Sequence, residues 1–373
     1  MALSKISNDM FTTISRPNVS PIIINGNQSV SQRTTSVAMS NGIYCTDRYK
    51  HAISNDGAAT ITQESLSSGS AFTDGFANAL KIDVTTADSS LSSAQHYFIR
   101  YSIEGQDIQN IKKGTASAEK LTLAFWVKAT KTGTNVVRIY TADSDRSCSI
   151  AYTVSSSDTW EKKILNFPAD TTGTVIADDN TVGMQIDWGV AAGSNYTSGT
   201  LATAWASNTS ANDFVGQVNN LDSTSNNFHI TGIQLEIGEF SSTSIPPFQH
   251  EVFTDNLKRC QRYYETTFDY GTAIGSSTSV GMIRSGGNQG GRTSGRMGHS
   301  HTYHTLKRAV PTVTFYDNSG NEGSCARIDQ GSSTGSDKNM GVATGARTNV
   351  QVTSTGDSTA DVMVYHFTAE AEL

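Results

Sequence analysis

A strict alternation of side chains is the feature that most constrains the fold of this chain. In the stretch 121–129, LTLAFWVKA, the first, third, fifth and seventh residues are large and apolar. The opposite side carries Thr122, Ala124, Trp126 and Lys128. The stretch 233–237 repeats the pattern, with apolar residues on one face and a glutamine and a glutamate on the other. One apolar face at a period of two is typical of a half-buried β-strand.

The composition extends this prediction to most of the chain. Hydrophobic residues make up 36% and charged residues only 16%, and Ser, Thr, Gly and Asn replace the missing charge. This balance favours short strands joined by polar turns over a helical bundle. Further strands are predicted at 95–103, 135–141, 149–154, 160–167 and 182–190. Many short strands predict a jelly-roll β-sandwich, whose long polar loops 169–181 and 191–226 are of the kind that often carries binding.

With 373 residues, about two domains are expected at roughly 100–200 residues each. The predicted segments are an N-terminal arm (1–20), a jelly roll (21–245), a linker helix (246–266) and a C-terminal β domain (267–373). Pro246 and Pro247 mark the boundary, because proline supplies no ladder donor. Within 251–265, apolar residues then recur at helical spacing.

The C-terminal segment is predicted to be a second β domain. Its strands are expected at 299–307, 311–317, 347–353 and 360–369. The last of these is apolar on both faces, which is typical of a strand that is central in its domain or buried against another subunit. The predicted fold class is therefore all-β: a jelly-roll β-sandwich followed by a smaller C-terminal β-sandwich domain, joined by a short helix.

Charge and cysteine content narrow the environment and the partners. The formal net charge is −7 and no basic patch stands out, so nucleic acid is not expected as a partner. No run of about 18 apolar residues occurs and residues 1–20 lack the pattern of a secretory signal, so no membrane insertion is expected. We expect synthesis in a reducing cytoplasm, with free and mostly buried thiols. The cysteines are Cys45, Cys148, Cys260 and Cys325.

Several segments carry a resemblance when they are taken in order. They are PIIINGNQSVSQR (21–33), YCTDRY (44–49), IEGQDI (103–108), LTLAFWVKA (121–129), the strand from Trp160 to Pro168, FHITGIQLEIGEFSSTSIPPFQH (228–250), RCQRYYE (259–265), PTVTFYDNSGNEG (311–323) and AEAEL (369–373). This ordered set covers most of the chain and resembles a family of tail-fibre and receptor-binding virion proteins, many of them from marine and aquatic tailed phages. Tyr49 departs from the family, where Trp is commoner at this position.

The resemblance implies a carbohydrate-binding-module-like jelly roll within a homo-oligomeric virion assembly, with a trimer favoured and other virion proteins as partners. The chain would then be located in the virion as a tail-fibre or receptor-binding subunit that attaches to host surface glycan. Two alternatives stay open. One is a capsid decoration, head-fibre or tail connector protein held by protein contacts. The other is a glycan-degrading tailspike enzyme, although a β-helix repeat of roughly 20–30 residues is not visible in the sequence.

Exposed aromatic residues are the first candidates for glycan contact, because the C–H groups of a sugar ring pack favourably on a π face. Trp126 lies on the polar side of its strand, and three aromatic residues bracket the loop 191–204, with two polar residues as anchors. The candidate glycan-binding residues are Trp126, Asp187, Trp188, Asn195, Tyr196 and Trp205. The alternative is packing: a loop or a neighbouring subunit covers Trp126, and the other tryptophans belong to the core or to loop bases.

Two groups of residues are candidate metal ligands. His299 and His301 share a face if 299–307 is a strand, and a trimer would bring six imidazoles together, enough for a transition metal. The pairs Asp143/Asp145 and Asp178/Asp179 lie in predicted loops, and the family resemblance implies a possible structural Ca²⁺. Exposed histidines and solvated turn residues are the simpler interpretations. Apart from such a calcium ion, no cofactor is expected.

The sequence does not point to catalysis. A GxSxG match occurs at 331–335, but its flanks are polar and lack the strand and helix of a nucleophile elbow. Glu104, Asp187 and Glu236 are conceivable glycosidase carboxylates, yet their spacing in sequence fixes no geometry. The glycines at 286–295 are not followed by GK[ST], so no phosphate-binding loop is predicted. We therefore expect a protein that binds and is not an enzyme.

Overall fold

The computed structural model describes residues 20–285, 295–328, 336–356 and 362–373. The described chain forms two compact units. The N-terminal unit comprises 20–29, 37–43 and 49–252, and the C-terminal unit comprises 30–36, 44–48 and 253–373. The predicted boundary at 245/246 is therefore displaced to 252/253, and two short N-terminal segments belong to the C-terminal unit. The predicted arm, apart from Ser20, lies outside the described residues.

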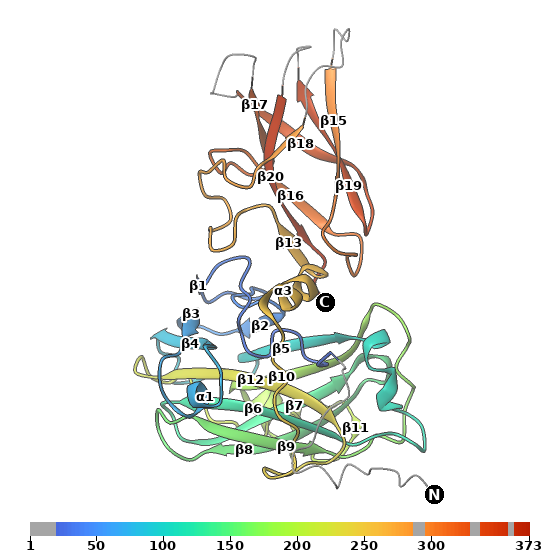
Figure 1. The fold of residues 1–373 in the computed structure, drawn as a ribbon. Helices are drawn as coiled ribbons and strands as arrows, with labels where there is room; N and C mark the ends of the chain where they lie inside the picture. The colour runs from blue at the N-terminus through green and yellow to red at the C-terminus, as the bar shows by residue number, and fades with distance from the viewer. Residues whose placement is uncertain (1–19, 286–294, 329–335, 357–361) are drawn as a thin grey trace, which may run out of the picture. The chain divides into compact units, whose positions relative to one another are not determined.

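The described N-terminal unit is a sandwich of two six-stranded antiparallel sheets, seen as two layers in Figure 1. Sheet A has the order β1 (Ser36–Ala38), β3 (Ala58–Ser65), β4 (Asn78–Thr86), β12 (Asn227–Ile237), β6 (Leu121–Ala129) and β9 (Glu161–Phe167). Sheet B has the order β11 (Ala206–Ser207), β8 (Arg146–Val154), β7 (Gly133–Thr141), β10 (Val182–Ala192), β5 (His96–Glu104) and β2 (Tyr49–Ser54). The short helices are α1 (Ser70–Thr73), η2 (Gly105–Asp107), η3 (Gln109–Ile111), η4 (Ala142–Ser144), α2 (Ser194–Thr197) and η5 (Ser210–Asn212). The all-β jelly-roll sandwich predicted from the sequence is confirmed.

The space between the two sheets holds an aromatic core. Trp188 on β10 is fully buried and meets Phe125 on β6 edge to face, with ring centroids 6.0 Å apart. Tyr152 on β8 contacts the same phenylalanine at 5.3 Å. His51 on β2 is also fully buried, and its Nδ1 lies 2.7 Å from the hydroxyl of Tyr97. Alternation on both sheets therefore directs large side chains into one shared core.

Strand β6 is more deeply buried than its alternation predicts. Thr122 and Ala124, expected on an open face, are 0% and 1% exposed. The chain after β12 covers this face: Gln234 donates to the carbonyl of Pro246 at 3.0 Å, and the Thr122 hydroxyl donates to the carbonyl of Gly238 at 2.8 Å. The prediction that β6 is half-buried was therefore wrong at this end of the strand, because the chain after β12 covers its second face.

Gly232 fixes a bulge in β12 beside Trp126. Its φ is +61°, and an added Cβ would lie 2.7 Å from the ring of Phe76 and 3.0 Å from that of Trp126. We expect Gly232→Ala to lower the free energy of unfolding by about 1–2 kcal/mol, because alanine is strained at positive φ and meets a packed ring. Urea denaturation followed by tryptophan fluorescence measures the change, and an unchanged midpoint would contradict it.

The C-terminal unit is built around its last strand. Its described elements are α3 (Phe253–Gln261), β13 (Tyr264–Thr266), β14 (Ile283–Ser285), β15 (Gly295–Thr302), β16 (Thr312–Tyr316), β17 (Ser324–Ile328), β18 (Ser336–Gly345), β19 (Asn349–Gly356) and β20 (Val362–Glu370). Strand β20 pairs with β13, β14, β16 and β17, and β18, β19 and β15 extend the sheet beyond β17. Met363, Tyr365 and Phe367 are 0% exposed, which confirms the prediction of a central strand.

The helix predicted within 251–265 and the strand predicted at 299–307 are both shorter in the structure. Helix α3 ends at Gln261, and Tyr264, expected on the helix, lies in β13 instead. Strand β15 ends at Thr302, so His304 lies outside it. The His304 main-chain N–H and Nδ1 instead contact the buried carboxylate of Glu265. This tertiary contact ends the strand before residue 307.

Two further predictions can be compared with the described residues. All four cysteines are free and buried, as expected, and burial raises the pKa of the Cys148 thiol to about 12. Within the parts of the chain that the structure describes, no helix has both the length and the apolar character needed to cross a membrane.

Candidate functional site

The outer face of sheet B arranges polar side chains in register across four neighbouring strands. Asp187 on β10 is paired with Arg100 on β5 and with Arg138 on β7. Arg100 is in turn paired with Lys50 on β2. One pleat further, Gln185 stands beside Tyr140 on β7. Since alternate residues of these strands enter the core, this register leaves the polar ones facing outward together.

An ion-pair network holds the centre of this face. Arg100 makes a bidentate contact with Asp187, with its Nε at 2.7 Å and Nη2 at 3.1 Å from the two carboxylate oxygens. Arg138 donates to Asp187 and to Asp213, each at 2.5 Å. Burial opposes ionisation of Asp187, which is 0% exposed, but Arg138 and Arg100 outweigh it and hold the pKa of that carboxyl below its usual value. The network therefore fixes the orientation of both arginines.

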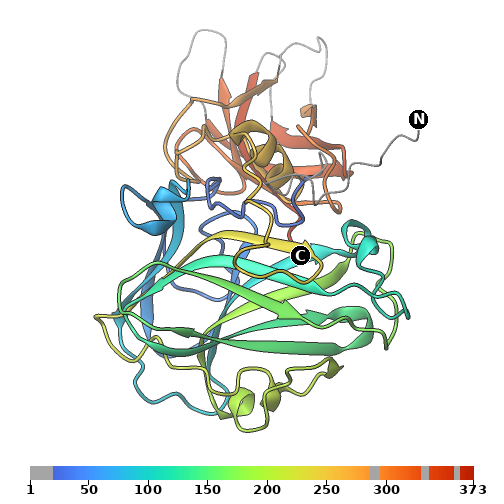
Figure 2. The same ribbon diagram turned by 60° about the horizontal axis from the view of Figure 1, so that its bottom comes forward.

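The chain that follows β10 covers one end of the same face. Phe214 stacks on Phe98 with ring centroids 4.1 Å apart, and Tyr196 on α2 contacts Phe98 edge to face at 5.5 Å. Asp213 connects this segment to Arg138, and Figure 2 shows the segment in yellow-green at the rim of the sandwich. This segment packs closely over Gly189, where an added Cβ would lie 2.4 Å from the side-chain oxygen of Gln217.

The other end of the face remains open to solvent. Lys50, Arg100, Tyr140 and Gln185 are all partly exposed there, and we call these four residues the polar strip. They span β2, β5, β10 and β7, which is roughly 14 Å at about 4.8 Å per strand. The strip combines an aromatic ring, an amide and two cations on a rigid sheet. Such a set can stack on an apolar ring face and hydrogen-bond its polar substituents.

Two of the predicted site residues do not face a ligand. Trp188 is 0% exposed and packs against Phe125 between the sheets, so it does not frame a glycan pocket, and the alternative of core packing is confirmed. Alternation gives the reason, because Trp188 follows Asp187 and the two side chains point to opposite faces of β10. Asp187 does lie on the outer face, but its carboxylate is buried and its oxygens are bound by arginines. It positions Arg100 and Arg138 and offers no free acceptor.

The other four predicted residues lie in three different places. Asn195 is exposed and Tyr196 partly exposed on α2, where Tyr196 also contacts the ring of His96 at 5.1 Å. Trp205 donates from Nε1 to the carbonyl of Pro168 at 2.7 Å, so it anchors a loop base. Trp126 belongs to the opposite sheet. The predicted pocket around 191–204 is therefore not formed by these six residues.

Trp126 is partly covered by residues of its own chain near Asp74 and Phe76. Its ring packs against the cluster that contains Phe76, and its Nε1 donates to Asp74 at 3.0 Å. The ammonium group of Lys162 lies 5.9 Å from the ring centroid. Trp126 is therefore only partly exposed and is held by its own chain, as the packing alternative predicted.

The residues of the polar strip were missed at the sequence level, although the signal was present. The strand predicted at 135–141 places Arg138 and Tyr140 opposite two core residues, and that at 182–190 places Gln185 and Asp187 opposite Trp188. Alternation alone therefore predicts an outward polar set on each strand. The pairing register joins strands that are far apart in the sequence. The sequence alone therefore did not show that the outward polar residues of these strands are neighbours.

The proposed metal sites are not supported in the described residues. No group of three or more His, Cys, Asp or Glu side chains there could hold a metal ion. His299 and His301 do share a face, but it is the inner one: Nδ1 of His299 lies 3.0 Å from the Tyr365 hydroxyl, and the ring of His301 lies 4.8 Å from that of Phe367.

The aspartates proposed for calcium are used by the fold instead. Asp143 accepts from the main chain of Ala177, and Asp145 from the hydroxyl of Tyr140. Asp179 accepts from Thr181, while Asp178 is exposed. Three of these four carboxylates therefore make contacts within the chain, and the possible structural Ca²⁺ stays a prediction.

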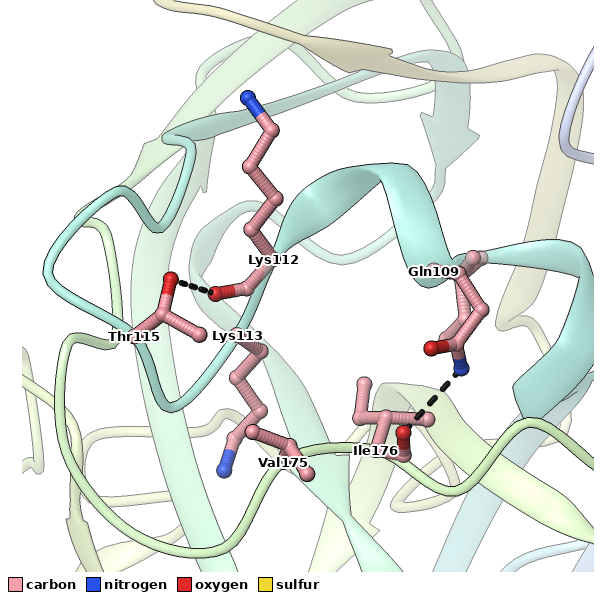
Figure 3. Close-up of a pocket in the computed structure, with 7 residues that line it drawn as sticks. Gln109, Lys112, Lys113, Thr115, Val175 and Ile176 are labelled. Carbon is pink, nitrogen blue, oxygen red and sulfur yellow. Dashed lines mark hydrogen bonds between the residues drawn. The ribbon is translucent and has the colours of Figure 1, made fainter.

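A cavity of about 440 Å³ lies beside η3 (Figure 3). It is lined by Ile108, Gln109, Lys112, Lys113, Thr115, Val175 and Ile176. Lys113 donates to Ser144 and to the carbonyl of Thr174, and it pairs with Asp170 at 3.2 Å. Figure 3 shows the ammonium groups of the two lysines pointing in opposite directions. Because the polar group of Lys113 is already engaged, the cavity is a weaker candidate than the polar strip.

No known family model matches the chain, and neither does any curated protein. Among solved structures, it is similar to the enzymatically active domain of tailspike protein 4 of bacteriophage CBA120, at 13% identity and a TM-score of 0.26, over 58% of this chain and 21% of that one. It is also similar to a family 11 carbohydrate-binding module of Clostridium thermocellum, at 13% identity and a TM-score of 0.28, over 57% of this chain and 99% of that one. The chain thus spans about a fifth of that tailspike domain. At these values the similarities carry no argument about function.

Proposed function

We propose that this chain is a non-enzymatic glycan-binding subunit and that its polar strip is the contact surface. The observation that carries the proposal is the register of Lys50, Arg100, Gln185 and Tyr140 on one open sheet face. A sugar presents both an apolar ring face and many hydroxyl groups. The Tyr140 ring meets the first, while the amide of Gln185 and the guanidinium of Arg100 meet the second.

Rigidity supports this choice of surface. The strip lies on strands and not on a loop, and the network of Asp187 and Arg138 holds Arg100 in place before any ligand arrives. A preorganised surface loses less conformational entropy on binding. The flat and open shape offers few contacts per sugar, so each site binds weakly and several copies raise the overall affinity.

The finer proposal is that the chain acts in a tailed-phage virion as a tail-fibre or receptor-binding subunit, in a homo-oligomer that contacts other virion proteins. The ordered sequence segments that resemble such proteins support it, as does the multivalency that weak sites require. The glycan would then belong to the host surface.

Tyr140→Ala should weaken glycan binding about tenfold, because a lost stacking contact of about 1.4 kcal/mol changes an equilibrium constant by that factor. Binding of the purified chain to a glycan array identifies the ligand, and titration calorimetry gives the affinities. Tyr140→Phe keeps the ring and should retain binding. Thr153→Ala, at an exposed position of β8 on the same sheet, is the surface control. Equal affinities of Tyr140→Ala and the wild type would contradict the proposed site.

An adsorption assay tests the virion role. Excess purified chain should block attachment of the phage that encodes it to host cells, and Tyr140→Ala should block it less. A chain that binds virions without blocking attachment would favour the capsid decoration, head-fibre or connector alternative. Release of reducing sugar from host polysaccharide would overturn the non-enzymatic proposal.

A further inference from the structure

The charges on the outer face of sheet B form a continuous chain across the strands. The chain begins at Asp213, continues through Arg138 and Asp187, and reaches Arg100, with each charge bound to the next of opposite sign. Up to Arg100 the two anions and two cations compensate each other. The alternation therefore predicts an anion at the next position.

The next position is occupied by a cation instead. Lys50 on β2 stands directly opposite Arg100 in the antiparallel register. Like charges directly opposite each other on antiparallel strands destabilise a sheet. Among the residues that the structure describes, no carboxylate forms an ion pair with Lys50. No contact in the described residues shows that the pairing of Lys50 with Arg100 stabilises the sheet.

Arg100 has donor capacity left for an external anion. Its Nε and Nη2 donate to Asp187, whereas no hydrogen bond of Nη1 is found within the described ranges. The side chain is 25% exposed, and that of Lys50 is partly exposed. A guanidinium edge beside an ammonium group is a suitable partner for a carboxylate, sulfate or phosphate group.

We propose that the Lys50–Arg100 end of the polar strip binds the anionic substituent of an acidic glycan. This inference rests on the proposed function of the strip and adds the class of ligand to it. The Tyr140–Gln185 end then contacts the ring of a neighbouring sugar. An anion between Lys50 and Arg100 restores the alternation of charge, because its attraction to both cations outweighs their mutual repulsion.

Lys50→Glu is the discriminating variant, because it reverses the charge at this end and leaves Tyr140 and Gln185 unchanged. It places a carboxylate opposite Arg100, so the Tm of the N-terminal unit should rise. Lys128→Glu is the matched control, since it makes the same charge change on a partly exposed residue of sheet A. A lower Tm for Lys50→Glu would contradict the repulsion on which the inference depends.

Binding is measured on an array of neutral, uronate-containing and sulfated glycans at low and high salt. The best uronate ligand is tested again after its carboxyl groups have been reduced to alcohols. The wild type should prefer acidic glycans, lose at least tenfold affinity after carboxyl reduction, and bind less tightly in high salt. Lys50→Glu should lose this preference, and Lys128→Glu should keep it. The uronate and sulfate members distinguish the two sources of negative charge.

Other outcomes separate this inference from the proposed function. Neutral glycans that bind as tightly as acidic ones, with Tyr140→Ala weakened and Lys50→Glu unaffected, would overturn the acidic class and leave glycan binding standing. Equal binding of single-stranded DNA would indicate general anion attraction and overturn the inference. Absence of binding to every glycan would overturn both.

Discussion

Replacing Arg48 by methionine should destabilise the C-terminal unit while leaving the stability of the N-terminal unit unchanged. The Arg48 side chain is 2% exposed and forms an ion pair with Glu372, whose side chain is 5% exposed. Its guanidinium carbon also lies 3.3 Å from the ring centroid of Tyr263. Removing one partner of a buried pair costs about 3–5 kcal/mol when the other charge is left alone. Here Glu372 keeps Arg33 at 3.3 Å, so the loss should lie at or below the lower end of that range. Methionine keeps most of the side-chain length, so the lost charge is the main change.

The distribution of tryptophan makes this prediction measurable unit by unit. All four tryptophans lie between residues 126 and 205, in the N-terminal unit. Guanidinium denaturation followed by fluorescence therefore reports on that unit, whereas far-UV circular dichroism reports on both. We expect the dichroism to show an early transition in Arg48→Met that fluorescence does not show. Lys258→Met, at an exposed position of α3, should match the wild type. A single transition at the wild-type midpoint for Arg48→Met would contradict the prediction.

Acid should destabilise the N-terminal unit through His51. Burial lowers the pKa of this histidine from 6.5 to about 3. Between these values the unfolded chain binds a proton that the folded chain does not, so the contribution of His51 is complete above pH 6.5 and is lost as the pH falls toward 3. At about 1.4 kcal/mol per pH unit, the loss approaches about 5 kcal/mol at the acid end.

His51→Asn removes the ionisable group and should flatten this part of the stability profile. The measurement is the free energy of unfolding of both proteins by urea between pH 7 and pH 4, followed by tryptophan fluorescence. Tyr97→Phe removes the hydroxyl that contacts His51 Nδ1 and keeps the buried imidazole, so it should retain the wild-type slope. The same dependence on pH for His51→Asn and the wild type would contradict the assignment of this effect to His51.

The sequence predicted the regular elements well because their signals are local. Period-two alternation located β5, β7, β8, β9 and β10 of the sandwich to within a few residues. For β20 the same reasoning left two alternatives, a central strand or one buried against another subunit, and the structure shows the first. Errors arose where a distant segment decides the outcome. The chain after β12 covers β6, and a contact with Glu265 draws His304 away from β15.

The division of the chain into units was harder to predict. Residues 30–36 and 44–48 lie close to β1 in sequence yet belong to the C-terminal unit. Gln32, for example, donates to Asp47 at 2.5 Å and to the carbonyl of Tyr264 at 2.9 Å. Linear composition carries no signal for such long-range pairing, so the segments were assigned to the jelly roll.

The candidate site also depends on long-range pairing that the sequence does not show. Tryptophans were predicted as glycan-binding residues, but in this chain Trp188 packs in the core and Trp205 anchors a loop base. The polar strip uses commoner residue types, and only the register of four strands makes them a set. Asp187 was predicted as a polar anchor of a pocket near 191–204, whereas in the structure it orients Arg100 on the outer face of sheet B.

The most direct test of the central claim is a crystal structure of the chain with its best array ligand. The account predicts a sugar ring stacked on Tyr140, hydrogen bonds to Gln185, and an acidic group within ion-pair distance of Lys50 and Arg100. A ligand bound instead at Trp126, or in the cavity between Ile108 and Val175, with the polar strip free of sugar, would contradict it.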